Sequence, residues 1–157
     1  GALTDKGRFS SRIYSDEIIT GELFATNFYH ELDEYQLMLI IASLCYEPRK
    51  RTEFYKTFPS KSLNQLKKKI PQSLGMQKRF HYLNSMTALI YPSFHGKDIF
   101  EIQKNTNLVE GDIIRFFRQM LDKFSQIKEA TEDMKLKYMI NICQEKITSS
   151  LSDIDKI

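Results

Sequence analysis

The sequence is poor in several residue types: its 157 residues include no tryptophan, two cysteines, four prolines and six glycines. Few glycines and prolines leave most of the chain free to form helix and argue against long disordered linkers. The two cysteines, Cys45 and Cys143, are too far apart in sequence to indicate a disulfide framework or a metal motif. We expect both to be buried thiols, as is usual inside cells.

Long apolar runs are also missing. No run approaches the roughly 20 residues of a membrane-spanning helix, and no signal peptide is visible. Hydrophobic residues make up 41% and charged residues 27%, which is typical of a soluble globular protein. These features predict an intracellular protein with no membrane partner.

The length fits one domain. We therefore expect a single helical-bundle domain over residues 1–157, with a lead-in segment at 1–14 and a basic connecting region at 48–81. The chain starts at Gly1 and Ala2 without a methionine, so we expect it to be a fragment of a longer protein.

Charge is unevenly distributed along the chain. Ten basic residues and one acid, Glu53, lie between Pro48 and His81, which gives this region +9 within a total of +3. The remainder therefore carries −6. Such a region can form a nucleic-acid surface or dock an acidic partner, or it can be a lysine-rich loop and helix face in solvent. The sequence leaves these interpretations open.

Apolar residues recur every three or four positions through most of the chain, which is the spacing of amphipathic helices. No strand pattern of any length is present, and the sequence predicts an all-α helical bundle. Leu37, Ile40, Ile41 and Leu44 give one expected helix a broad apolar face and a central place in the core. The expected helices span about 15–30, 33–45 (starting at Leu32 or Asp33), 62–70, 79–91 (ended by Pro92), 97–104, 112–127 and 131–150, with a turn at 105–111.

Catalytic and metal-binding patterns are not found. The three histidines, His30, His81 and His95, are scattered, with no cysteine or carboxylate at metal-ligand spacing. The stretch Gly96–Asp98 lacks the upstream glycine and the hydroxyl of a phosphate-binding loop. We therefore predict no catalytic residue, no metal site and no cofactor in this chain.

The stretch EGDIIRFFRQMLDKFSQI, Glu110–Ile127, has a helical pattern. At about 100° per residue its apolar side chains fill one arc of roughly 160°. The opposite arc carries Arg115, Arg118, Gln119 and Asp122. From the pattern alone this row is either a solvated face with an Arg118–Asp122 ion pair or a set of guanidinium and amide groups placed for phosphates and bases.

The segment Lys97–Ile127 also has the outline of a helix-turn-helix, with a short helix, a turn and an amphipathic second helix. A DNA-binding module is therefore an alternative. Its second helix suits a major groove poorly, because the apolar arc is broad and the polar arc includes Asp112 and Asp122.

Three stretches resemble one family, the C-terminal helical (DSHCT) domain of superkiller-type DExH-box RNA helicases that feed the RNA exosome. Leu3–Arg8 (LTDKGR) is similar to the family's L-T-x-K-G-R motif, and Asp16–Phe24 (DEIITGELF) to its D-E-L-L-L-T-E-L-L/M-F segment. Ile102, Thr106 and the run Glu110–Arg115 (EGDIIR) resemble I-x-x-x-T-x-x-x-E-G-S-I-I-R. The order is that of the family, and the likeness covers positions 3 to about 127.

The resemblance implies a helical bundle packed on two RecA-like motor domains, closing a channel for single-stranded RNA. It implies RNA contacts at Arg115, Arg118, Gln119 and Asp122, although Gln119 stands where the family has arginine. ATP and Mg²⁺ would bind the motor domains of the parent helicase, which would unwind RNA 3'–5' and feed it to the exosome or its adaptor proteins. A nuclear location is expected in preference to a cytoplasmic one.

Overall fold

The computed structural model describes residues 20–21, 23–24, 28–70 and 74–152. The chain divides into two compact units, residues 1–31 and 32–157, which are described separately. In the first unit, the described residues between Thr20 and Phe24 are helical and Phe28–Glu31 form the 3-10 helix η1. The expected helix start at Ser15 and the segment 1–14 lie outside the described residues. A single domain over 1–157 stays a prediction.

The second unit is all-α, which confirms the predicted fold class. Among the described residues, the one β feature is an isolated bridge between Phe54 and Thr106. The elements are α2 (Glu34–Cys45), α3 (Lys61–Lys69), α4 (Leu74–Arg79), α5 (Leu83–Phe94), α6 (Ile99–Ile102), the 3-10 helix η2 (Gln103–Asn105), α7 (Glu110–Ala130) and α8 (Met134–Leu151).

Helix α2 is the centre of this unit, as the sequence predicts. Every residue from Tyr35 to Leu44 is buried, and α2 contacts α5, α7 and α8. Its start is set by a capping box in which the Asp33 carboxylate accepts from the Gln36 N–H and the Gln36 amide oxygen accepts from the Asp33 N–H. Gln36 Nε2 also donates to the Ser62 carbonyl at 3.0 Å, which ties α3 to α2.

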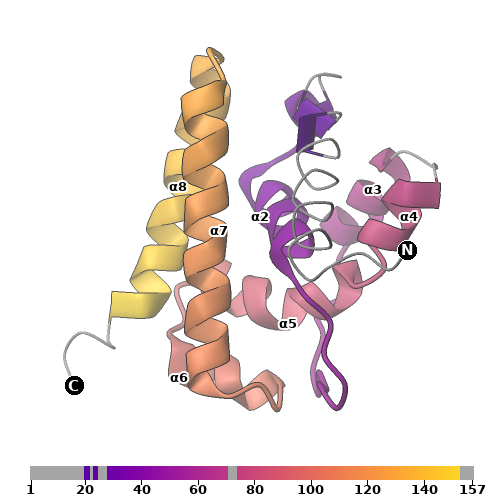
Figure 1. Cartoon of the computed structure of the whole chain (residues 1–157), viewed down its shortest axis with the longest axis vertical. Coiled ribbons are helices and arrows are strands. Elements are labelled where there is room, and N and C mark those ends of the chain that lie inside the picture. Colours follow the sequence, from indigo (N-terminus) through magenta and orange to yellow (C-terminus); the bar gives the residue numbers. More distant parts are fainter. Residues whose placement is uncertain (1–19, 22, 25–27, 71–73, 153–157) are drawn as a thin grey trace, which may run out of the picture. The chain divides into compact units, whose positions relative to one another are not determined.

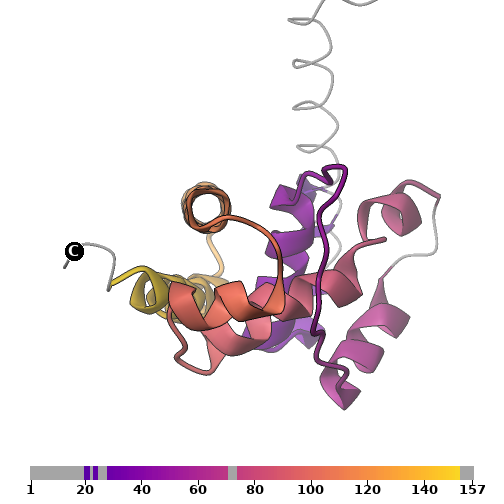
Figure 2. The same ribbon diagram turned by 90° about the horizontal axis from the view of Figure 1, so that it is seen from below.

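The two longest helices, α7 and α8, run antiparallel side by side (Figure 1). Figure 2 shows α7 end-on. The apolar arc of α7 faces the bundle, and Phe117, Met120 and Phe124 are fully buried there. Hydrogen bonds join the two helices on their polar flank: Gln144 Nε2 donates to Ser125 Oγ at 3.0 Å and Lys128 Nζ to Asn141 Oδ1 at 3.1 Å.

The prediction that Pro92 ends a helix at Tyr91 is wrong, because Pro92 lies inside the last turn of α5. Proline has no N–H, so it leaves the carbonyl four residues earlier without its helical partner. That carbonyl, Ala88 O, accepts a buried hydrogen bond from Asn105 Nδ2 at 3.0 Å. A side chain 17 residues downstream therefore allows the helix to continue past the proline.

Other helix boundaries also differ from the sequence-based expectation. The helix expected from Arg79 begins at Leu83 instead (α5), because Arg79 is the last residue of α4 and residues 80–82 form a turn between the two helices. Helix α7 begins at Glu110, so Gly111 is helical and does not belong to the preceding turn. The last helix begins at Met134, three residues later than expected, because Asp133 caps it through the Lys135 and Leu136 N–H groups.

The described parts of the basic connecting region, residues 48–70 and 74–81, include helices α3 and α4. Ser60 caps α3, and the three lysines of its last turn, Lys67, Lys68 and Lys69, lie where the helix dipole favours cations. Arg79 donates from Nη2 to the Leu44 carbonyl at the end of α2. Since α2 has no basic residue in its own last turn, this distant arginine satisfies one of its terminal carbonyls.

Candidate nucleic-acid interface

The polar row of α7 is exposed along its whole length. Arg115, Arg118, Gln119 and Asp122 are all exposed, and at 100° per residue they occupy an arc of about 100°. The opposite face is buried, so the helix is held by its apolar side and the row is left for solvent or a ligand. This placement agrees with both interpretations of the row.

Two of the four residues line a pocket and two do not. A small open pocket of about 60 Å³ lies between the end of α2, the segment after it and α7. Arg115 and Gln119 line this pocket, together with Cys45, Tyr46 and Arg49. Arg118 and Asp122 project from the neighbouring exposed side of the helix. We call the pocket and the four-residue row together the arginine site.

Asp112 holds the charged part of the arginine site together. Its Oδ1 lies 3.6 Å from Arg115 Nη1 and 3.6 Å from Arg49 Nη1. The arginine side chains are 63% and 58% exposed, so each ion pair contributes only about 0–1 kcal/mol to stability. The expected Arg118–Asp122 ion pair is not formed among the residues that the structure describes; Arg115 pairs with Asp112, one turn earlier on the same helix.

Arg49 reaches α7 because the segment that follows it is fixed to the turn before α7. The Asn107 side chain accepts from the Glu53 N–H at 2.8 Å and donates to the Arg51 carbonyl at 2.6 Å. Thr106 Oγ1 donates to the Glu53 carbonyl at 2.7 Å, and the Tyr55 N–H donates to the Asn105 carbonyl at 2.7 Å. These bonds join residues 50 to 56 positions apart in the sequence, and no local pattern predicts them.

Aromatic rings form one wall of the pocket. Tyr46 is buried and meets Phe116 of α7 edge-on, with ring centroids 6.3 Å apart. It also meets Phe54 at 5.9 Å and Tyr82 at 5.3 Å. Burial, with a smaller contribution from Tyr82, raises the pKa of the Tyr46 hydroxyl. A tyrosine hydroxyl is neutral near pH 7 even without this shift, so Tyr46 adds no negative charge beside the arginines.

The pocket lining carries two arginines and two carboxylates, since Glu47 joins Asp112 there. Its net charge is therefore zero. Such a site provides hydrogen-bond donors with defined directions, but its electrostatic field is weak. The guanidinium groups present forked N–H donors that suit phosphates, and the Gln119 amide can both donate to and accept from a base edge.

The other chemical groups considered in the sequence are placed as follows. Both cysteines are reduced thiols; Cys143 is fully buried, while Cys45 is partly exposed and lines the pocket. Burial raises the pKa of Cys143, whose Sγ contacts the Glu34 carbonyl at 3.4 Å. In the described part of the chain, no group of three or more histidine, cysteine or acidic side chains is arranged to hold a metal ion.

Sequence reasoning did not identify Arg49, Asp112 or Tyr46 as one group. Arg49 belongs to the basic run, and Asp112 to the start of α7, but nothing in either local pattern points to the other. Their meeting depends on the hydrogen bonds of Thr106 and Asn107.

These observations define a class: an all-α helical-bundle domain whose longest helix presents a polar row to the exterior. The DSHCT (NUC185) domain family matches residues 1–150, and the chain belongs to that family. This confirms the family resemblance found in the sequence. DSHCT domains are accessory domains found in DExH-box helicases. No curated protein sequence matches the chain significantly. None of the described helices is long and apolar enough to cross a membrane.

Proposed function

We propose that this chain is the C-terminal accessory domain of an ATP-dependent DExH-box RNA helicase and that its arginine site contacts single-stranded RNA in the helicase channel. Arg115 and Arg118 bind phosphates, while Gln119 and Asp122 contact bases. The parent helicase unwinds RNA 3'–5' and passes it to the exosome or its adaptor proteins.

The observation that carries this proposal is that α7 is buried on one face and exposed along its polar row. Its buried face fixes the helix, and all four residues of the polar row remain exposed. Asp112 positions Arg115 through an ion pair, so a phosphate meets a guanidinium group that is already oriented. Gln119 beside Arg115 supplies a neutral hydrogen-bonding group in the same pocket.

In this proposal the other partners of the chain are the RecA-like domains of the same helicase, which bind ATP and Mg²⁺. Exposed apolar side chains support such a packing role. Met134 and Tyr138, one turn apart on α8, are 73% and 66% exposed. Large apolar groups at adjacent positions of a helix are suited to an interface between domains.

The test is the double variant Arg115→Ala/Arg118→Ala in the full helicase. We expect RNA-stimulated ATPase activity and unwinding to fall about tenfold or more, as for loss of two charge-assisted phosphate contacts. The thermal melting of the isolated chain should barely change, because both side chains are exposed.

The matched control is Lys61→Ala/Lys78→Ala, which removes the same charge at two exposed positions outside the row and outside the surface around Met134 and Tyr138. We expect it to leave helicase activity unchanged. Activity retained by the arginine variant would refute the channel role. Equal losses in both variants would show a general charge effect and refute the assignment to the arginine site.

Two other functions are distinguished by titrating the chain with single-stranded RNA, duplex DNA and an acidic peptide at two salt concentrations. Docking of an acidic protein partner is favoured by Lys67 and Lys68, which are exposed at the end of α3. A DNA-reading role is disfavoured by the first turn of α7. The N-terminal residues of a recognition helix contact base edges, but in α7 this turn carries Asp112, which pairs with two arginines.

A further inference from the structure

A second pocket lies away from the arginine site. Its lining shares no residue with that site, and it has a volume of about 450 Å³, within the usual range for small-molecule sites. It is formed by the segment before α3, the end of α5 and the α6–η2 region. The charged and aromatic residues that line it, here called the lysine groove, are Lys56, Phe58, Tyr91, His95, Lys97, Glu101 and Lys104.

Three rings are layered along one wall of the lysine groove. Phe58 stacks on Tyr91 with ring centroids 4.4 Å apart and planes 11° apart. His95 lies 4.2 Å from Tyr91 at 32°. The Phe58 N–H donates to Thr87 Oγ1 at 2.9 Å, which fixes this extended segment to α5. The wall is therefore held by backbone as well as ring contacts.

His95 is the exposed end of this wall. Its Nδ1 lies 2.8 Å from the Tyr91 carbonyl, which can only accept, so Nδ1 carries the proton. This bond orients the ring and leaves Nε2 directed away from it. A planar group entering the groove therefore meets an oriented, exposed ring.

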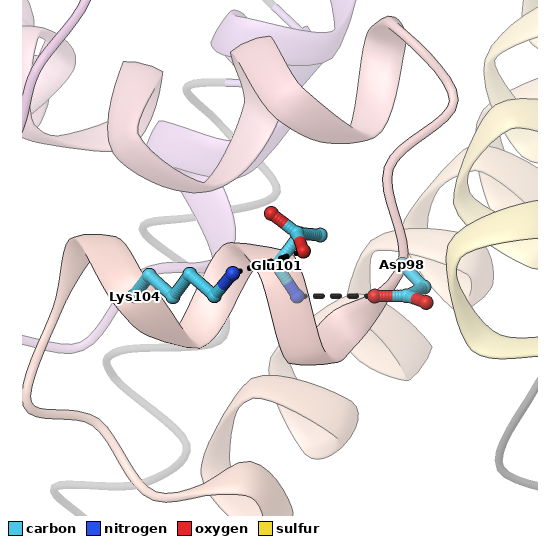
Figure 3. Close-up of polar contacts among 3 residues, drawn as sticks. All are labelled: Asp98, Glu101 and Lys104. Carbon is cyan, nitrogen blue, oxygen red and sulfur yellow. Dashed lines mark hydrogen bonds and ion pairs between the residues drawn. The ribbon is translucent and has the colours of Figure 1, made fainter.

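The groove carries a positive charge. Its lining contains three lysines and one acid, a net charge of +2. The acid, Glu101, is already paired with Lys104 at 3.0 Å (Figure 3). Lys56 Nζ lies 5.2 Å from the centre of the Phe58 ring, a cation–π contact that does not neutralise its charge. Lys97 forms no ion pair with any residue that the structure describes.

We propose that the lysine groove binds one or two nucleotides of a single-stranded nucleic acid, with phosphates on Lys56, Lys97 and Lys104 and a base stacked on the exposed ring of His95. Lysines that track a backbone beside aromatic rings that stack with bases are the combination used for single strands. An acidic peptide would use the lysines but would not need a layered aromatic wall. This site does not depend on the arginine site, so either can exist without the other.

The test measures binding of a short fluorescein-labelled oligouridylate to the purified 157-residue chain by anisotropy. The variant Lys56→Ala/Lys97→Ala/Lys104→Ala should weaken binding about tenfold and reduce the salt slope by about 2, as expected for three lost phosphate contacts. The matched control Lys61→Ala/Lys68→Ala/Lys135→Ala removes three exposed lysines outside the groove and should have little effect.

A second measurement places the base. Oligonucleotides carrying 4-thiouridine should cross-link to the tryptic peptide Phe80–Lys97, which contains both Tyr91 and His95, and His95→Ala should reduce this cross-link several-fold. The Arg115→Ala/Arg118→Ala variant should keep the cross-link, so failure of the arginine site is distinguishable from failure of this one.

Three outcomes would overturn the proposal: equal loss of affinity in the groove variant and its control, no cross-link to the peptide Phe80–Lys97, or displacement of the oligonucleotide by polyglutamate at equal charge concentration. The last result would identify the groove as a site for acidic peptides.

Discussion

The arginine site and the lysine groove use positive charge in different ways. In the arginine site, Asp112 lies between two guanidinium groups and the pocket lining is neutral overall. In the lysine groove, two of the three lysines have no carboxylate partner among the described residues, and the lining carries +2. The first arrangement fixes the direction of its donors, whereas the second produces a stronger field.

This difference predicts different behaviour toward a polyanion. Lysines without a carboxylate partner, such as Lys56 and Lys97, should contribute most of the salt-dependent affinity for a single-stranded nucleic acid. Arginines positioned by an internal counter-ion should contribute orientation and discrimination. Both regions depend on the same turn: Asn107 bonds to Arg51 and Glu53, near Arg49, and the Asn105 carbonyl accepts from the Tyr55 N–H, next to Lys56.

The largest effect is expected when the support shared by the two regions is weakened. Asn105→Ala leaves the Ala88 carbonyl buried without a partner, which should lower the free energy of unfolding by about 1–3 kcal/mol. Urea denaturation measures the change. In a Pro92→Ala background the cost should be smaller, because the new N–H at position 92 can donate to the same carbonyl. An identical cost in both backgrounds would show that Asn105 acts by another route.

A smaller effect is expected when only the arginine site loses its support. Asn107→Ala removes two hydrogen bonds to the segment around Arg51 and should cost about 1 kcal/mol of stability, since Asn107 is exposed. RNA affinity of the arginine site should fall, while cross-linking to the lysine groove is retained. Asn64→Ala, an exposed asparagine on α3, is the control. Loss of both binding activities would show that the two regions are not separable.

Cysteine alkylation offers a footprint of the arginine site alone. Cys45 lines its pocket, whereas Cys143 is fully buried with a raised pKa. Iodoacetamide should therefore modify Cys45 first, as followed by mass spectrometry. Bound RNA should slow this reaction roughly several-fold by covering the pocket, with Cys143 as the internal reference. Unchanged Cys45 reactivity at saturating RNA would place the RNA elsewhere.

The smallest effect is expected from removal of the counter-ion. Asp112→Asn breaks two exposed ion pairs, which should cost less than about 1 kcal/mol of stability. RNA affinity should rise by roughly a few-fold, because a negative charge beside the phosphates is removed. Glu129→Gln, an exposed acid near the other end of α7, is the control. Weaker RNA binding by Asp112→Asn would show that orientation of the arginines outweighs their net charge.

Local patterns predicted the parts of the fold that local forces decide. The start of α2 follows from Asp33 and Gln36, whose capping box needs only residues three apart. The buried and exposed faces of α7 follow from the helical period, and its four polar candidates are exposed as their spacing requires. Their role in RNA binding stays a prediction.

Two sequence-based expectations were wrong, one because of a distant contact and one because of small energy differences within a single helix. Proline predicts a helix end, yet Asn105 supplies the donor that lets α5 continue past Pro92. Neighbours at i and i+4 predict an Arg118–Asp122 pair, yet Arg115 pairs with Asp112. Exposed pairs on one helix differ by so little energy that sequence spacing alone does not select among them.

By itself, therefore, the sequence determined an all-α bundle, the face that each long helix buries and membership of the DSHCT family. It could do so because helix periodicity, helix caps and family motifs each depend on residues that are close together in the sequence. Only the tertiary structure decided which charges share a pocket. Hydrogen bonds between residues 51–55 and 105–107 bring Arg49 to Asp112 and set Lys56 beside α6. Such bonds form only after the core has brought distant segments together, and for that reason no local pattern records them.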